Sequence, residues 1–171
     1  FVDFGAGTGS FQNGAVYQTA RTNLSPFGGT DGSGQFNFGY GWNYAGQSAN
    51  SSFYDMTTVA IHEIGHGLGF LSATDSAGRG LIRRTTGSPD IYAVFDRYIQ
   101  RGNAGTGNLL NTNIASTGFA SFTGQVSTLT NGNNTSTGLF FGGQYAREVF
   151  GGSPLLYAPA GYQDGSSTSH V

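Results

Sequence analysis

The amino-acid sequence predicts an α+β fold for this chain of 171 residues, and three observations carry the prediction. Residues 1–50 carry β-branched and aromatic residues with glycine turns, and helix signals are clear from Ser52 or Asp55 to Gly67. Glycine, serine, threonine and asparagine dominate much of the rest of the chain. We expect a twisted amino-terminal β-sheet, a helix behind it and a loop-rich lower part. The expected organisation is a single domain, with residues 1–70 as its upper part and residues 71–171 as an insertion and lower part.

Composition limits the classes of partner. Only 9% of the residues are charged, the formal net charge is −2 and lysine is absent, so no basic patch is available for nucleic acid. Cysteine is absent too, which excludes disulfides and thiolate metal sites. No apolar run approaches the length of a membrane span. The lysine-free, Gly/Ser/Thr/Asn-rich composition favours a secreted protein, and nothing in it indicates an oligomeric state.

The first 50 residues hold two candidate strands. "GAVYQTARTNL" (residues 14–24) and "QFNFGYGWNY" (residues 35–44) carry β-branched and aromatic residues. The segment between them, "SPFGGTDGSG", predicts a loop. Its spacing from Asp31 to Gln35 is only a partial match to a calcium loop, so a solvated turn is the better interpretation and calcium is unsupported.

A helix is predicted from Ser52 or Asp55 to Gly67. Either of the first two residues can cap its amino end. Glycines at 65, 67 and 69 weaken and end it, because glycine adopts the left-handed turn that follows many helices.

The remaining elements are short. "SPDIYAVFDRYIQRG" (residues 88–102) has a helix-start signal and a helical apolar stripe, but it also fits an exposed strand. Residues 111–138 predict short strands and turns. "GGQYAREVF" (residues 142–150) predicts one or two helical turns.

The chemistry is concentrated in "TTVAIHEIGHGLGFL". His62 and His66 lie four residues apart, so on a helix they share one face, and both imidazoles can reach one zinc ion. Glu63 follows the first histidine and can take a proton from a zinc-activated water. The apolar, uncharged flanks strengthen the prediction of a zinc protease over a helix with two structural histidines.

A catalytic zinc needs a third protein ligand. In the compact pattern H-E-x-x-H-x-x-G-x-x-H, that ligand would fall on Ser72, which is a poor zinc ligand. Glu148 would complete a His-His-Glu set, and the remaining candidates are His170 and the aspartates Asp75, Asp90, Asp96 and Asp164. We favour His170, because it is the one remaining histidine of the chain.

Three segments resemble those of secreted bacterial zinc metalloproteases of the metzincin type. They are "DMTTVAIHEIGHGLGFLS", "PDIYAVFDRYIQRGNAGTGNLL" and "LFFGGQYAREVFGGSPLLYAPAGYQDGSSTSH". The layout is also similar to leishmanolysin-like metzincins, in which a long insertion precedes the third histidine. The resemblance implies zinc on His62, His66 and His170, Glu63 as general base, a protein or peptide substrate, and a turn beneath the metal at Gly69.

One departure from this family concerns methionine. Metzincins carry a methionine-containing turn after the third histidine, whereas the single methionine here, Met56, precedes the helix. We therefore expect the catalytic domain to be incomplete at its carboxyl end. The alternative function, favoured by low charge and by this departure, is a non-catalytic extracellular structural or adhesive domain on a metzincin-like scaffold.

Aromatic residues supply weaker hypotheses. Tyr40, Trp42 and Tyr44 precede the helix and can pack in a core or touch a substrate. Tyr157 and Tyr162 lie near His170 in sequence and are candidate oxyanion donors, a role that geometry alone decides.

Overall fold

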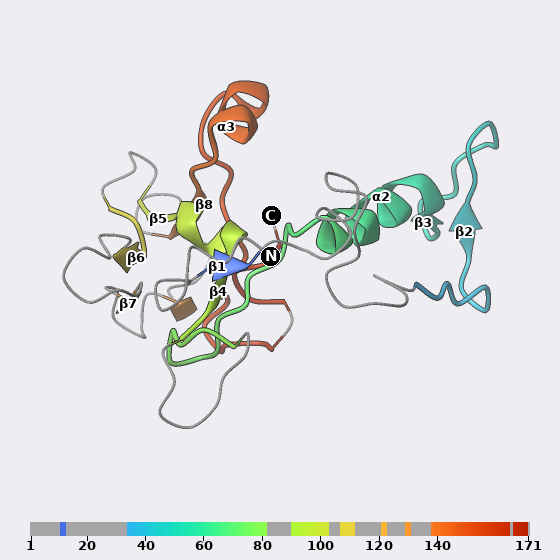
Figure 1. The fold of residues 1–171 in the computed structure, drawn as a ribbon. Helices are drawn as coiled ribbons and strands as arrows, with labels where there is room; N and C mark the ends of the chain where they lie inside the picture. The colour runs from blue at the N-terminus through green and yellow to red at the C-terminus, as the bar shows by residue number, and fades with distance from the viewer. Residues whose placement is uncertain are drawn as a thin grey trace, which may run out of the picture. The chain divides into compact units, whose positions relative to one another are not determined.

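A computed structural model describes residues 11–12, 34–81, 90–102, 107–111, 121–122, 129–130, 138–164 and 166–170 (Figure 1). These residues form two α-helices and short two-stranded sheets, which confirms that the chain mixes helices and strands. The chain divides into two compact units: unit 1 is Phe1–Asn13 with Leu71–Val171, and unit 2 is Gly14–Phe70. Within the described ranges, no helix is long and apolar enough to cross a membrane.

In unit 2, the strand predicted over residues 35–44 is much shorter than expected. Only β2 (Trp42–Asn43) is a strand there, and it pairs in parallel with β3 (Tyr54–Asp55). A turn interrupts the run, because the side chain of Asn37 accepts a hydrogen bond from the backbone N–H of Gly39 (2.8 Å). The strand predicted over residues 14–24, and with it most of the expected twisted sheet, lies outside the described residues.

The predicted helix is confirmed as α2 (Met56–Gly67). Asp55, rather than Ser52, is its N-cap: a carboxylate oxygen of Asp55 accepts a hydrogen bond from Thr58 N at 2.6 Å. Because Asp55 also ends β3, the helix starts directly at the sheet edge, without a linker.

Gly69 ends α2 in a Schellman motif. Its φ of 101° lies in the region that favours glycine, and its N–H donates to His66 O at 2.9 Å. The next N–H, of Phe70, reaches back to Gly65 O at 3.0 Å. This turn brings the backbone of Phe70 back against the last turn of the helix.

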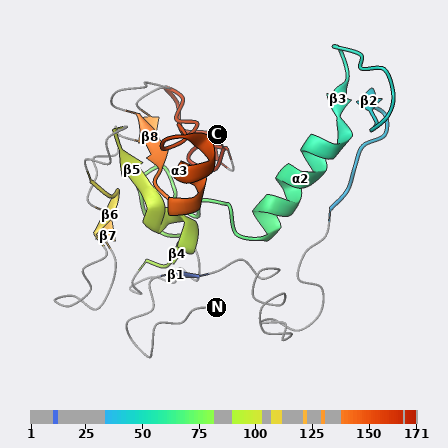
Figure 2. The ribbon, with the colours of Figure 1, turned by 90° about the horizontal axis from the view of Figure 1, so that it is seen from above.

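Among the described residues of unit 1, the elements in chain order are β1 (Phe11–Gln12), β4 (Tyr92–Ala93), the 3-10 helix η1 (Val94–Tyr98), β5 (Ile99–Arg101), β6 (Leu110–Asn111), β7 (Ser121–Phe122), β8 (Leu139–Phe141) and α3 (Gln144–Phe150). β1 pairs with β4 in parallel, while β5 pairs with β8 and β6 with β7 in antiparallel fashion. Figures 1 and 2 both show β5 and β8 side by side.

The core of unit 1 lies around the β5–β8 pair. Phe95 stacks on Phe141 with ring centroids 4.7 Å apart. The buried apolar cluster consists of Ala93, Phe95, Ile99, Leu109, Leu129, Leu139, Leu156 and Ala158. Burial of these side chains is the main stabilising contribution that a loop-rich unit of this kind can obtain.

Residues 90–102 are neither the helix nor the exposed strand that their pattern allows. They form β4, the short 3-10 helix η1 and β5, because pairing with β1 and β8 satisfies backbone groups on both sides of η1. β4 is buried, and β5 begins at a buried residue and continues half-buried, with Tyr92 and Ile99 at 1% and 0% exposure. The helical turns predicted over residues 142–150 are confirmed as α3, which ends at Phe150 with Gly151 as its C-cap.

Candidate metal centre

His62 and His66 lie on consecutive turns of α2, and their rings converge. The two Nε2 atoms are 3.0 Å apart and the ring centroids 4.5 Å. Two nitrogens bound to one tetrahedral zinc at about 2.0–2.1 Å would lie roughly 3.3 Å apart. The distance between the two Nε2 atoms is therefore close to the one that a shared cation requires. The fold of α2 alone determines this distance, because both histidines lie on that helix.

The orientation of the His66 ring is fixed by the helix end. Nδ1 of His66 lies 2.8 Å from the carbonyl oxygen of Phe70. A carbonyl oxygen only accepts hydrogen bonds, so Nδ1 carries the ring proton and Nε2 of the neutral ring is the lone-pair nitrogen. The Gly69 turn thus selects the tautomer that can bind a metal through Nε2.

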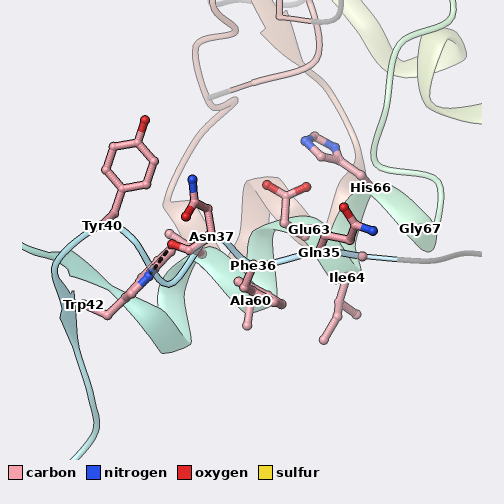
Figure 3. A pocket seen from close by; sticks show the side chains of 12 residues that line it. Gln35, Phe36, Asn37, Tyr40, Trp42, Ala60, Glu63, Ile64, His66 and Gly67 are labelled. Carbon is pink, nitrogen blue, oxygen red and sulfur yellow. Dashed lines mark hydrogen bonds between the residues drawn. The ribbon is translucent and has the colours of Figure 1, made fainter.

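Glu63 shares a cavity of about 820 Å³ in unit 2 with His66. Figure 3 shows the Glu63 carboxylate and the His66 ring on one side of α2, with Tyr40 and Trp42 at the other end of the cavity. The indole N–H of Trp42 donates to Asn37 O at 3.0 Å, which fixes that aromatic wall. Of the three aromatic residues suggested for substrate contact, Tyr40 and Trp42 line this cavity; Tyr44 is not part of the lining.

His170 follows a compact turn in unit 1. Its Nδ1 lies 2.8 Å from Ser166 O, so the same reasoning makes Nε2 its lone-pair nitrogen. The backbone of the turn is held on Tyr157, whose N–H donates to His170 O (2.7 Å) and whose carbonyl accepts from Thr168 N (2.8 Å). Three polar side chains before His170 are buried: Ser167, Thr168 and Ser169.

Ser72 contacts the turn that carries His170. The backbone N–H of Ser72 donates to Oγ of Ser169 at 3.1 Å. Ser72 is the position at which the compact zinc pattern has its third histidine, and Ser169 directly precedes His170. The contact lies within unit 1. It joins Ser169, the residue before His170, to Ser72, the position of the third histidine in the compact pattern.

The other candidate ligands in unit 1 have partners of their own. Asp75 forms an ion pair with Arg79 (2.6 Å); burial opposes ionisation, but hydrogen bonds from Arg79 and Ala77 hold its pKa below the ordinary value. Glu148 is exposed on α3 and accepts a hydrogen bond from Gln144 (3.0 Å). Asp75 is thus occupied by a structural ion pair, and Glu148 is a solvent-exposed side chain on α3.

Two further aspartates and the two candidate tyrosines also lie in unit 1. Asp164 is exposed and Asp90 is half-buried next to Tyr92. The Tyr162 hydroxyl donates to Thr74 O at 2.6 Å, and the Tyr157 hydroxyl to Gln163 Oε1 at 3.2 Å. Both tyrosines suggested as oxyanion donors thus bond to groups of unit 1.

Sequence reasoning treated Asp96 only as a candidate ligand. In the structure it is 1% exposed, and Oδ2 accepts from Ala73 N (3.2 Å) and Ala93 N (2.8 Å). Burial raises the pKa of Asp96 to about 6, and hydrogen bonds from Ser72, Ala73 and Ala93 partly offset that rise. The one signal for this role was an acidic residue inside the apolar run "YAVFDRYI".

No protein-family model matches the sequence, and neither the curated proteins nor the solved structures include a match to it. The resemblance to metzincins therefore stays a prediction from the motifs of the chain.

Proposed function

We propose that this chain is a secreted zinc-dependent endopeptidase of metzincin type, with His62, His66 and His170 as zinc ligands and Glu63 as general base. The observation that carries the proposal is the orientation of the histidine rings. Both His66 and His170 give Nδ1–H to a backbone carbonyl 2.8 Å away. A hydrogen bond of this kind is the usual support of a metal-binding histidine, because it fixes the ring and raises the basicity of Nε2.

The contact between Ser72 and Ser169 supports His170 as the third ligand. In the compact pattern the third histidine stands six residues after the second, and here that position is Ser72. The hydrogen bond from Ser72 N to Ser169 Oγ ties this position to the residue before His170. We infer that the long insertion returns a histidine to the place where the pattern would otherwise carry it, as in the leishmanolysin-like layout.

The proposed reaction is peptide-bond hydrolysis. A zinc ion held by these histidines would supply Lewis-acid activation of a water molecule and of the peptide carbonyl. Glu63 accepts the proton of the attacking water and delivers it to the leaving amine. The cavity beside Glu63 has the size of a small-ligand site, and Tyr40 and Trp42 give it an aromatic wall against which a peptide side chain could pack.

The test compares two glutamate variants of the full-length protein, since Glu63 and Glu148 are the two glutamates of this chain. Glu63→Gln should keep wild-type zinc content by elemental mass spectrometry and lose about 10²–10⁴-fold in peptide cleavage. Glu148→Gln should change neither quantity. Undiminished cleavage by Glu63→Gln would refute the assignment.

The third ligand is tested in the same preparation. His170→Ala should lose most of the bound zinc, whereas Glu148→Gln should retain it. Zinc retention by His170→Ala together with zinc loss in Glu148→Gln would transfer the third-ligand role to Glu148.

The second candidate function is an extracellular structural or adhesive domain without catalysis. One observation favours it: α3 exposes Tyr145 and Val149 at 79% and 90%, an apolar surface on a short helix. Zinc binding without any peptide cleavage by the full-length wild type would support this candidate over the protease.

A further inference from the structure

Asp96 is a buried carboxylate that the proposed ligand set does not use. It is 1% exposed, and the backbone N–H groups of Ala73 and Ala93 both donate hydrogen bonds to its Oδ2. Oδ1 receives no well-formed hydrogen bond from the described residues, although the hydroxyl of Ser72 lies close enough to lower the pKa. Burying a carboxylate is costly, so its retention at this position calls for a role.

The segment Ser72–Thr74 connects Asp96 to the His170 turn. Ala73 N donates to Asp96 Oδ2, and the adjacent Ser72 N donates to Ser169 Oγ. These two amides are neighbours on one stretch of backbone, so a shift of one displaces the other. Thr74 O is fixed as well, by the hydroxyl of Tyr162 at 2.6 Å.

Asp96 also contacts β4, on the core side of the Ser72–Thr74 segment. Ala93 N, its second donor, lies in β4, and Phe95 beside Asp96 belongs to the buried apolar cluster. The carboxylate therefore joins the core of unit 1 to the Ser72–Thr74 segment through two charge-assisted hydrogen bonds. The segment in turn holds the turn that ends at His170.

We propose that Asp96 is a positioning residue for His170: it fixes the Ser72–Thr74 segment, and this segment fixes the His170 turn through Ser169. The inference rests on the proposed function only in taking His170 as a zinc ligand. Asp96 does not touch the metal; it determines how well the third imidazole is pre-oriented, as outer-shell partners of metal ligands do.

The experiment measures zinc affinity by competition with a fluorescent chelator, on the full-length protein at pH 7 and at a temperature where circular dichroism shows every variant folded. Asp96→Ala should weaken zinc binding about 10–100-fold. Asp96→Asn keeps an oxygen acceptor for Ala73 and Ala93, so it should restore affinity to near the wild-type value. A carboxylate that bound zinc directly would not be replaced by an amide, so equal losses in the two variants would overturn the positioning role.

A double-mutant cycle tests the path through Ser169. Ser169→Ala removes the acceptor of Ser72 N. The double variant with Asp96→Ala should lose less zinc affinity than the product of the two single fold-losses, because both substitutions act through one segment. Independent, multiplying losses would refute the path. Should Asp96→Ala fail to fold, Ser169→Ala and Asp96→Asn still test the inference.

Ile99→Val is the matched control for plain destabilisation. Ile99 is fully buried in the same core, so the variant should lower the midpoint of urea unfolding and leave zinc affinity unchanged. A wild type that binds no zinc overturns the proposed function, and with it the metal role of Asp96. A wild type that binds zinc with unchanged affinity in Asp96→Ala and Ser169→Ala overturns the inference alone.

Discussion

The carbonyl oxygen of Phe70 lies 2.8 Å from Nδ1 of His66, four residues earlier in the chain. The Gly69 turn produces this contact, because it reverses the backbone immediately after α2. Gly69 thus acts on His66 through the hydrogen bond to Phe70 O. The motif is a local device that orients one ring before any distant residue is involved.

Substitution of Gly69 should impair metal binding through this contact. Gly69→Ala places a side chain at φ 101°, which is costly for any L-residue, and should shift the Phe70 carbonyl away from His66. We expect a loss of zinc affinity of about tenfold or more. Gly65→Ala is the control, since a Cβ there meets open space inside α2 and alanine should stabilise the helix by about 0.5–1 kcal/mol. Equal affinities for the two variants would contradict the role of the turn.

Asp96 should make the stability of the protein depend on pH in an unusual direction. Its pKa is about 6 in the folded state and 3.8 in the unfolded state, so the native state binds more protons between these values. The stabilisation is fully present below pH 3.8 and is lost as pH rises through about 6, a change of up to about 3 kcal/mol.

The measurement is urea unfolding at pH 4.5, 5.5, 7 and 8 for the wild type and Asp96→Asn. The difference between the two should change over this range and be flat above about pH 7. Tyr92 and Tyr162, which face Asp96, have raised pKa values and stay neutral throughout. A constant difference between wild type and variant would show that Asp96 does not titrate in this window.

The N-cap of α2 should respond to acid in the opposite direction. The Thr58 hydrogen bonds lower the pKa of Asp55, so the cap is present above its ordinary value of 3.8 and is lost as pH falls below it. Helicity of α2, followed by amide exchange of Thr58, should fall on acidification in the wild type. Asp55→Asn keeps a good cap without a titrating group and should remove this dependence. A variant with the wild-type acid response would exclude Asp55 as the origin.

Gly80 should tolerate a methyl group poorly. A Cβ there would overlap the backbone carbonyl of Ile91, next to β4, whereas a Cβ at Gly152 meets open space. Gly80→Ala should destabilise unit 1 by about 1–3 kcal/mol in urea unfolding, and Gly152→Ala should change it by less than about 0.5 kcal/mol. Similar values for both would mean that the close approach to Ile91 is easily relieved.

The elements that could be predicted from the sequence are those whose signals are local. Asp55, the glycine at 69 and the i, i+4 histidines specify α2, its cap and its end within fifteen residues, and the structure confirms them. The segment over residues 90–102 could not be assigned, because pairing with β1 and β8 decides its conformation and its own pattern fits two states. Asp96 was indistinguishable from the other aspartates, since burial depends on the fold around it. The zinc site itself stays a prediction.

The hydrogen bond between Ser72 and Ser169 joins residues 97 positions apart. Closing a loop of that length costs about 4 kcal/mol of free energy through lost chain entropy. His62 and His66, by contrast, come together as soon as α2 forms. Under the proposed ligand set, a nascent chain on the ribosome therefore displays a two-histidine site until residue 170 has emerged and the long loop has closed. The third ligand would therefore be added in a slow step of folding, because contacts between residues far apart in the sequence form more slowly than contacts within one helix.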